Sequence, residues 1–556
     1  MKVTLNGYAD EFPHPMTVQE LISQLDTARL NTALGASSGG TVLELTDTIS
    51  HDIDMRTVDY GDEEGRRIYE RSLRFVLLLA AERCFSDLSV RIEHSIGQGV
   101  YFELIGQRMM PDDAAMIEAE MRAIVEQDLP FEKQRWSRTK AIEYFEAKGK
   151  HDKSRLLQYR PYDHFDVYTA GGMAEYFYGA MLPSTGFVPV FALHSRPPGC
   201  VLLLPDRNNP LIPAKYTSLP KHMATFAQST YWCKVLNCVN AADLNDLVAD
   251  GGLRDFIRVN EALHDKSISD IADDIIRADA RVIFIAGPSS SGKTTFANRL
   301  SIHLRVNGLR PEIISLDDFY RDRDSLPLEE DGQPDLEALS ALDLPHFKTC
   351  IKSLLSGAET AMPRFDFTLK KRSSIPHILR ISPSQPLIIE GIHGLNPHLH
   401  ESFDQRMLYR IYISELTCLN LDDHNRIRTT DARLLRRLVR DQQFRNTPTE
   451  KTLAMWGSVR RGEEKWVFPF QEQADTVFNS ALHYELPVLK LISFDMLRKV
   501  PRSSPQFITC DRLLKILNYL LPAPESVLNE IPPLSILREF IGGNTLYLPA
   551  ENVKFL

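Results

Sequence analysis

The stretch VIFIAGPSSSGKTTFANRL, residues 282–300, decides the fold of the second half of this 556-residue chain. A short apolar run leads directly into GPSSSGKT, residues 287–294, which fits the phosphate-loop pattern G-x-x-x-x-G-K-[ST]. The next residues predict a helix that stops at Gly308, and a second apolar strand, PEIISL, follows it. Strand, loop, helix and strand in this order predict a βαβ unit of a parallel sheet.

A loop of this kind binds the phosphates of a nucleoside triphosphate. Its glycines let backbone N–H groups close around the β-phosphate, and the helix N-terminus adds a partial positive charge. We expect Lys293 to reach the β- and γ-phosphate oxygens and the Thr294 hydroxyl to ligate Mg²⁺. The expected nucleotide-binding residues are Gly287, Pro288, Ser289, Ser290, Ser291, Gly292, Lys293, Thr294 and Thr295.

Two later strands are predicted to end in carboxylates. The strand before SLDDFYRDRD, residues 315–324, ends beside Asp317 and Asp318, and a carboxylate there faces the ligand crevice of a doubly wound sheet. We predict that Asp317, with Asp318 as the alternative, accepts the proton of an acceptor hydroxyl, although either residue could simply cap a helix. The strand in QPLIIEGIHGLN ends at Glu390, which we expect to hold Mg²⁺ or its water unless it is only solvated.

The segment DARLLRRLVRDQQFRN, residues 431–446, is rich in arginine. Helical spacing places four of these arginines on or near one face. Such a face fits a solvated surface, a nucleic-acid contact, or a lid over the γ-phosphate. The residues concerned are Arg433, Arg436, Arg437 and Arg440, with Arg445 following them.

Composition bounds the class of protein. The apolar content of 43%, the charged content of 25% and the length predict a globular protein of several domains. A net charge of −10 argues against a dedicated nucleic-acid binder. Seven cysteines without a C-x-x-C pair, and the lack of an apolar signal core or membrane-spanning run, predict a cytoplasmic protein with free thiols and no membrane partner.

The first half has a different organisation. Short strands and a Thr-capped helix in TVQELISQL predict a small α+β unit. A helix from Asp62, a hairpin in residues 90–104 turning at Gly97-Gln98-Gly99, and a helix opening at Pro111 follow. Residues 196–215 are rich in proline and mark a boundary, and residues beyond 500 predict a helical tail.

The motifs GPSSSGKTT, SLDDFY, IIEGI and RRLVRD, in this order, resemble the uridine kinase and phosphoribulokinase superfamily over about residues 280–490. The resemblance implies an ATP- and Mg²⁺-dependent transfer of the γ-phosphate to a sugar hydroxyl. It implies that Asp317 is the base, and that Arg440 and Arg445 belong to a lid.

The same resemblance implies an acceptor site. Asp335 falls where the family binds ribose hydroxyls, and Phe365 falls where it stacks a nucleobase. Arg372 keeps the basic residue that follows the Phe365 motif. Tyr320 is the last residue of SLDDFY, near the expected catalytic base Asp317. Two departures, Lys370 in place of a pyrimidine-reading His and Met455 in place of a Gln, remove groups that would bond the base edge. The acceptor is therefore left open between a nucleoside and another sugar or polyol.

The N-terminal half resembles the front of threonyl-tRNA synthetases, with a TGS-like unit followed by an editing-like domain. The editing family needs an H-x-x-x-H pair, where this chain has Arg71 and Phe75, and a Cys and a His, where it has Phe177 and Met181. Editing hydrolysis is therefore not expected, and this half is predicted to be a binding or regulatory module. Contact with RNA and the oligomeric state, including a homo-oligomer, are left open.

These inferences predict an α/β protein: a doubly wound parallel-sheet kinase domain preceded by α+β domains. An alternative function is a nucleotide-switched regulatory protein associated with translation or RNA, although the chain has no N-K-x-D motif for guanine. The expected divisions are a TGS-like domain at 1–60, an editing-like module at 61–200, a connecting segment at 201–275, the kinase-like domain at 276–490 and a helical extension at 491–556.

Overall fold

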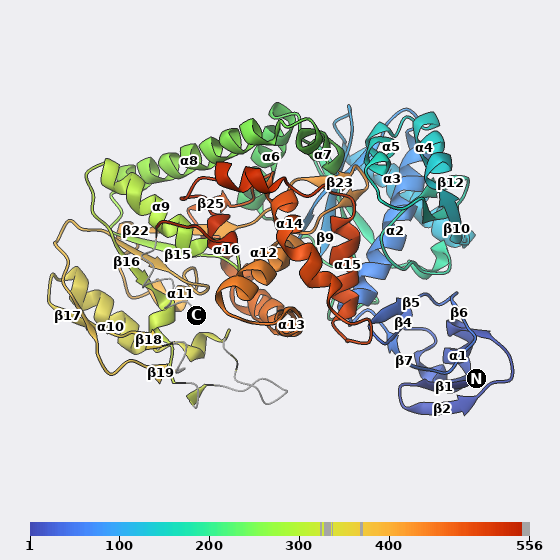
Figure 1. The fold of residues 1–556 in the computed structure, drawn as a ribbon, viewed down its shortest axis with the longest axis horizontal. Helices are drawn as coiled ribbons and strands as arrows, with labels where there is room; N and C mark the ends of the chain where they lie inside the picture. Colours follow the sequence, from blue (N-terminus) through green and yellow to red (C-terminus); the bar gives the residue numbers. More distant parts are fainter. Residues whose placement is uncertain (323–324, 327–334, 336, 367–370, 547–556) are drawn as a thin grey trace.

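The computed structural model describes residues 1–322, 325–326, 335, 337–366 and 371–546. Its N-terminal strands lie at one end of the molecule and the β17–β20 region lies at the other (Figure 1). The C-terminal helix α15 (Phe507–Leu517) runs back between these regions and lies beside α2 (Glu63–Cys84). An ion pair of 2.6 Å between Arg512 and Glu64 joins the two helices.

The N-terminal unit is a five-stranded sheet in the order β2-β1-β7-β4-β5, covered by α1. The predicted Thr cap is confirmed: the Thr17 hydroxyl accepts from the Glu20 amide, and the Glu20 carboxylate accepts from the Thr17 amide. The apolar face of α1 packs against strand residues Val3 and Leu5. The elements are β1 (Lys2–Leu5), β2 (Tyr8–Glu11), β3 (Met16–Thr17), α1 (Val18–Leu25), β4 (Gly35–Ser38), β5 (Thr41–Leu43), β6 (Thr48–Ile49) and β7 (Ile53–Val58).

The second unit is built around α2, which is buried along most of its length. The predicted hairpin is confirmed, with Ile96 opposite Gly99 at its turn. Two antiparallel sheets, β13-β14-β9-β8 and β10-β11-β12, complete this unit. The further elements are β8 (Val90–Ile96), β9 (Gly99–Leu104), α3 (Pro111–Gln127), β10 (Glu132–Ser137), α4 (Arg138–Ala147), α5 (His151–Gln158), β11 (His164–Ala170), β12 (Met173–Glu175), β13 (Ala192–Arg196) and β14 (Gly199–Leu203).

Residues 201–275, which we expected to connect the halves, carry three helices: α6 (Pro220–Val235), α7 (Ala241–Ala249) and α8 (Leu253–Arg277). The first residues of the segment still belong to β14 and pair with β9. Helix α8 packs on the kinase-like domain, where the ring of His264 lies 5.3 Å from that of Phe478. The segment therefore joins the two halves and also packs against the second of them.

The second half contains the predicted parallel sheet, in the order β16-β21-β15-β22-β25. Its central strand β15 (Val282–Ala286) is wholly buried and leads through the loop into α9 (Lys293–Val306). The strand β16 (Glu312–Ser315), which ends just before Asp317, and the strand β21 (Leu387–Glu390), which ends at Glu390, are neighbours, so Ser315 lies opposite Glu390. Ligands bind at this carboxyl edge in doubly wound sheets.

The remaining elements surround this sheet and form the C-terminal tail. One apolar core runs from Trp136 of the second unit to Phe540 of the tail, so the halves share their packing. These elements are α10 (Leu344–Leu355), β17 (Thr360–Met362), β18 (Phe365–Asp366), β19 (Lys371–Arg372), β20 (His377–Leu379), α11 (Pro397–His400), β22 (Leu408–Ser414), β23 (Asn420–Asp422), β24 (Asn425–Arg426), α12 (Thr429–Phe444), α13 (Thr449–Trp466), β25 (Thr476–Asn479), α14 (Glu485–Arg498) and α16 (Arg538–Ile541).

Candidate active site

The phosphate loop joins β15 to α9 as its sequence predicts. Gly292 has φ of +86° and caps α9, and a Cβ there would lie 2.5 Å from Ile536. A Cβ on Gly287 would collide with the carbonyl oxygen of Ile413. Both positions therefore require glycine, one for its backbone conformation and both for close packing.

Lys293 and Thr294 are the first residues of α9, directly after the loop. The Lys293 ammonium donates to the carbonyl oxygens of Gly287 and Pro288, at 3.0 and 3.3 Å. These bonds fold the lysine over the loop, where a phosphate oxygen would be its natural partner.

The C-terminal tail contributes a residue that sequence reasoning missed. Glu539 of α16 accepts hydrogen bonds from the Thr295 amide at 3.3 Å and from the Thr295 hydroxyl at 2.7 Å. A carboxylate therefore accepts a hydrogen bond from a backbone amide at the N-terminus of α9, where the helix attracts anions. No local sequence signal could have placed it there, because the two residues are 244 positions apart.

The arginines of α12 hold the backbone of the loop. Arg433 is buried, forms an ion pair of 2.5 Å with Glu463 and donates to the Ser289 carbonyl at 2.9 Å. Glu463 in turn accepts from the Ser289 amide at 2.9 Å, and Arg436 is buried in an ion pair with Glu485. The predictions that this helix face is a solvated surface or contacts nucleic acid are therefore wrong for Arg433 and Arg436.

The last arginines of this group gather around one carboxylate. Arg440 and Arg445 lie 3.0 and 3.6 Å from Asp441, and Arg437 lies 3.3 Å from it. The charge of Arg440 is the main reason why the pKa of Arg445 falls to about 10, and Asp317 partly offsets it. Three guanidinium groups around one carboxylate leave a surplus of positive charge near the loop, as an anion would require.

The predicted acids meet at the carboxyl ends of β16 and β21. The Ser315 hydroxyl donates to Glu390 at 3.0 Å and accepts from the Asp317 amide at 3.3 Å. Burial, followed by the charge of Asp317, raises the pKa of Glu390 to about 7, although Lys293 lowers it. Burial also raises the pKa of Asp317, while the charges of Lys293 and Arg445 act against this. The structure thus brings Lys293, Asp317 and Glu390 together.

The two aspartates of SLDDFY differ in their partners. The Asp318 carboxylate accepts from the Phe365 amide at 3.1 Å and so anchors β18. Within the described part of the chain, no group donates a hydrogen bond to the Asp317 carboxylate. Asp317 is therefore available to a ligand, and Asp318 is tied to the scaffold.

The expected acceptor-contacting residues lie near this edge. The rings of Tyr320 and Phe365 are 6.0 Å apart, and Asp317, Glu337 and Asp335 add to the burial that raises the pKa of Tyr320. Asp335 accepts from the Glu337 amide at 3.0 Å.

The guanidinium of Arg372 donates to the carbonyl oxygens of Tyr320 and Phe319 and pairs with Asp343 at 3.2 Å, so in this structure it holds the segment after Asp317 in place. Met455 lies on α13, whereas Lys370 lies outside the described residues.

Glu337 is a further acid that the sequence did not single out. Burial, followed by the charge of Glu463, raises its pKa to about 7, and Asp317 and Lys293 also act on it. It therefore adds a second carboxyl group beside the proposed base.

The donor set fits Mg²⁺. Hard oxygen ligands are present in Thr294 and Glu390, and Mg²⁺ characteristically takes one or two protein ligands with water and substrate phosphates completing its shell. The described residues hold no group of three or more His, Cys, Asp or Glu side chains suited to a metal, so the nucleotide would have to complete the site.

The four editing positions are brought together in the second unit, but they are packed as a core. The rings of Phe75 and Phe177 lie 6.4 Å apart, and Met181 is buried beside them. Arg71 is buried and donates to the carbonyl of Ala180. The arrangement provides no nucleophile, base or metal ligand at these four positions.

Comparisons with known proteins match different parts of the chain to different proteins. Residues 282–486 match the model of the Phosphoribulokinase / Uridine kinase family. Residues 282–486 therefore have the fold of this family.

The N-terminal region is similar to threonine–tRNA ligases. The ligase of Symbiobacterium thermophilum is 30% identical over 196 residues, 35% of this chain and 30% of the ligase. That of Carboxydothermus hydrogenoformans is 32% identical over 190 residues, 34% of this chain and 30% of the ligase. The chain thus spans less than a third of these relatives.

Solved structures resemble part of the chain only distantly. A D-glycerate 3-kinase from Cryptococcus neoformans is 16% identical, over 45% of this chain and 87% of that one, with a TM-score of 0.23. A protein described as "a Possible Uridine Kinase from Bacillus stearothermophilus" is 20% identical, over 38% and 97%, with a TM-score of 0.27. Among the described residues, no helix combines the length and apolar character needed to cross a membrane.

Proposed function

We propose that the protein is an ATP- and Mg²⁺-dependent kinase that transfers the γ-phosphate to a hydroxyl of a nucleoside of the uridine or cytidine type, or of a related sugar alcohol. The observation that carries the proposal is the Asp317 carboxylate, which stands near Lys293 without a hydrogen bond from any described group. A carboxylate so placed can accept the proton of a hydroxyl that attacks the γ-phosphate.

Each group has a role that follows from its place. The loop amides and Lys293 hold the phosphates, and the side chains of Thr294 and Glu390 would hold Mg²⁺, which shields the phosphate charge when bound. Arg440 and Arg445 stabilise charge on the phosphoryl group in transit. Tyr320, Asp335, Phe365 and Arg372 are proposed to shape the acceptor site.

The N-terminal half is proposed to bind or regulate rather than to hydrolyse. Its support is the core of apolar side chains and one arginine at the four editing positions. The small-molecule acceptor is therefore the substrate of the second half alone, and RNA is a ligand to be tested for the first.

The experiment is a panel of nucleosides, ribose sugars and inositols, each with ATP and Mg²⁺, read by ADP release above the background with water alone. We expect at least one acceptor to raise the rate, and expect Asp317→Asn to remove that increase. If ATP binds but no acceptor raises ADP release, or if Asp317→Asn keeps the full increase, the proposal fails.

A further inference from the structure

A cavity lies where α2 of the second unit meets the segment between β24 and α12 of the kinase domain. The cavity is narrow and partly open to solvent. Its lining carries two carboxylates, Glu70 and Asp431, and six guanidinium groups. The arginines are Arg67, Arg71, Arg74, Arg426, Arg428 and Arg512.

Four of these arginines have an anionic partner. Arg428 lies 2.6 Å from Glu70, and Arg74 lies 3.9 Å from the same residue. Arg67 and Arg512 share Asp431, at 3.5 and 3.2 Å, and each also pairs with a glutamate at the start of α2.

The other two, Arg71 and Arg426, have no carboxylate within 4 Å among the described residues. Arg71 bonds the carbonyl of Ala180, and Arg426 bonds the hydroxyl of Ser95. Their exposed fractions are only 8% and 7%. Burial lowers the pKa of each guanidinium to about 10, although the charge of Glu64 acts against this at Arg71 and that of Glu70 at Arg426. The Nε atom of Arg426 is also buried without a hydrogen-bond partner.

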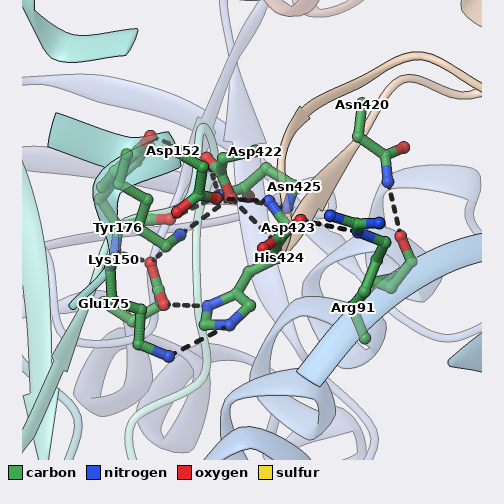
Figure 2. Close-up of polar contacts among 12 residues, drawn as sticks. Arg91, Lys150, Asp152, Glu175, Tyr176, Asn420, Asp422, Asp423, His424 and Asn425 are labelled. Carbon is green, nitrogen blue, oxygen red and sulfur yellow. Dashed lines mark hydrogen bonds and ion pairs between the residues drawn. The ribbon is translucent and has the colours of Figure 1, made fainter. Parts of the chain in front are cut away.

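The kinase side of the cavity is fixed in place by a polar network, shown in Figure 2. The hairpin β23–β24 inserts into the second unit, where Asp422 lies 2.9 Å from the buried Lys153 and accepts from the Tyr176 hydroxyl at 2.7 Å. Asp423 pairs with Arg91 at 2.7 Å. Arg426 follows directly after these anchored residues, so its unpaired charge is held at the cavity rather than free to reach solvent.

We propose that this cavity is a binding site for a small phosphate-type oxyanion, held between Arg71 of the second unit and Arg426 of the kinase domain. Two guanidinium groups without an ion-pair partner among the described residues match the charge of a dianion, and their forked N–H groups suit phosphate oxygens. The narrow space favours inorganic phosphate or a small phosphate monoester over a nucleotide. The anion would bridge the two halves, independently of the phosphate loop.

The first test is calorimetric titration with inorganic phosphate at constant ionic strength, and separately with glycerol phosphate as a monoester. Because phosphate also fits the nucleotide loop, the titration is repeated on Lys293→Ala. We expect Lys293→Ala to retain a phosphate site, and Arg71→Met and Arg426→Gln each to weaken that site at least about tenfold. Arg83→Gln, on the exposed part of α2 where Arg83 pairs with Glu120, is the matched control and should bind as the wild type does.

Two further measurements keep the outcome clear if one variant is unstable. Phosphate should slow hydrogen exchange in peptides covering 67–74 and 424–431 of the unaltered chain. Arg71→Met should be no less stable than the wild type without phosphate, because it removes an unpaired buried charge, and should lose the rise in melting temperature on adding phosphate. The proposal is overturned if Lys293→Ala abolishes all phosphate binding, or if both cavity variants bind phosphate normally. Neither result bears on the kinase reaction, which is tested separately by Asp317→Asn.

Discussion

The phosphate loop and the editing positions are both assembled from segments far apart in the chain, yet their contents differ. At the loop, the Asp317 carboxylate accepts no hydrogen bond from any described group and stands near Lys293 and Glu390. At the editing positions, two phenylalanines, a methionine and an arginine with a backbone partner fill the space. Each region keeps the backbone fold of its family, whether or not its side chains can carry out a reaction. The fold alone therefore does not show which half is chemically active.

The largest expected effect lies in the loop half. Lys293→Ala and Asp317→Asn should each lower phosphoryl transfer at least about 100-fold, because one removes charge stabilisation and the other the base. Steady-state ADP release with the best acceptor of the panel measures this. Asp318→Asn, which alters only the anchor of Phe365, should lose far less. Equal losses in Asp317→Asn and Asp318→Asn would show that the two aspartates have been assigned wrongly.

A smaller effect concerns the tail. Glu539→Gln should tighten ATP binding by about tenfold, because it removes a negative charge that bonds the Thr295 amide beside the phosphates. Calorimetric titration with ATP measures the affinity. Glu525→Gln, an exposed glutamate of the same tail, is the control and should leave the affinity unchanged. A weaker affinity in Glu539→Gln would mean that this carboxylate supports the nucleotide site.

The pH dependence of stability tests whether the acids of the loop half are buried as described. Glu390 has its pKa raised to about 7, so the folded protein binds a proton there that the unfolded chain releases near its ordinary pKa of 4.5. Its contribution to stability is therefore present below pH 4.5 and is lost as the pH rises through 7. Glu390→Gln should raise the melting temperature at pH 8 by about 3 °C and change it little at pH 4.5. An equal shift at both pH values would contradict the raised pKa.

The smallest effect is expected in the editing-like half. Restoring two histidines with Arg71→His plus Phe75→His should give no deacylation of mischarged tRNA, because Phe177 and Met181 still occupy the other two positions. Release of the amino acid from labelled mischarged tRNA is the measurement, with a threonine–tRNA ligase as the positive control. Measurable hydrolysis would contradict the inference that the editing-like half lacks catalytic groups.

Much of the site could be predicted from the sequence because its signals are local. The loop glycines are needed where they stand, since Gly292 has a positive φ and Gly287 has no room for a Cβ. Strand ends place Asp317 and Glu390 at one edge once the sheet is parallel. The hairpin, the capped helix and the arginine-rich helix also follow from short-range patterns.

The tertiary structure alone decided which groups remain available. The hydrogen bond from the Phe365 amide distinguishes Asp318 from Asp317, and the folding of the tail places Glu539 on Thr295. The burial of Arg433 against Glu463, and the lack of a carboxylate at Arg71 among the described residues, are likewise invisible in the sequence. The physical reason is that a charge's role depends on its partners and its exposure to water, and both are set by segments distant in the chain.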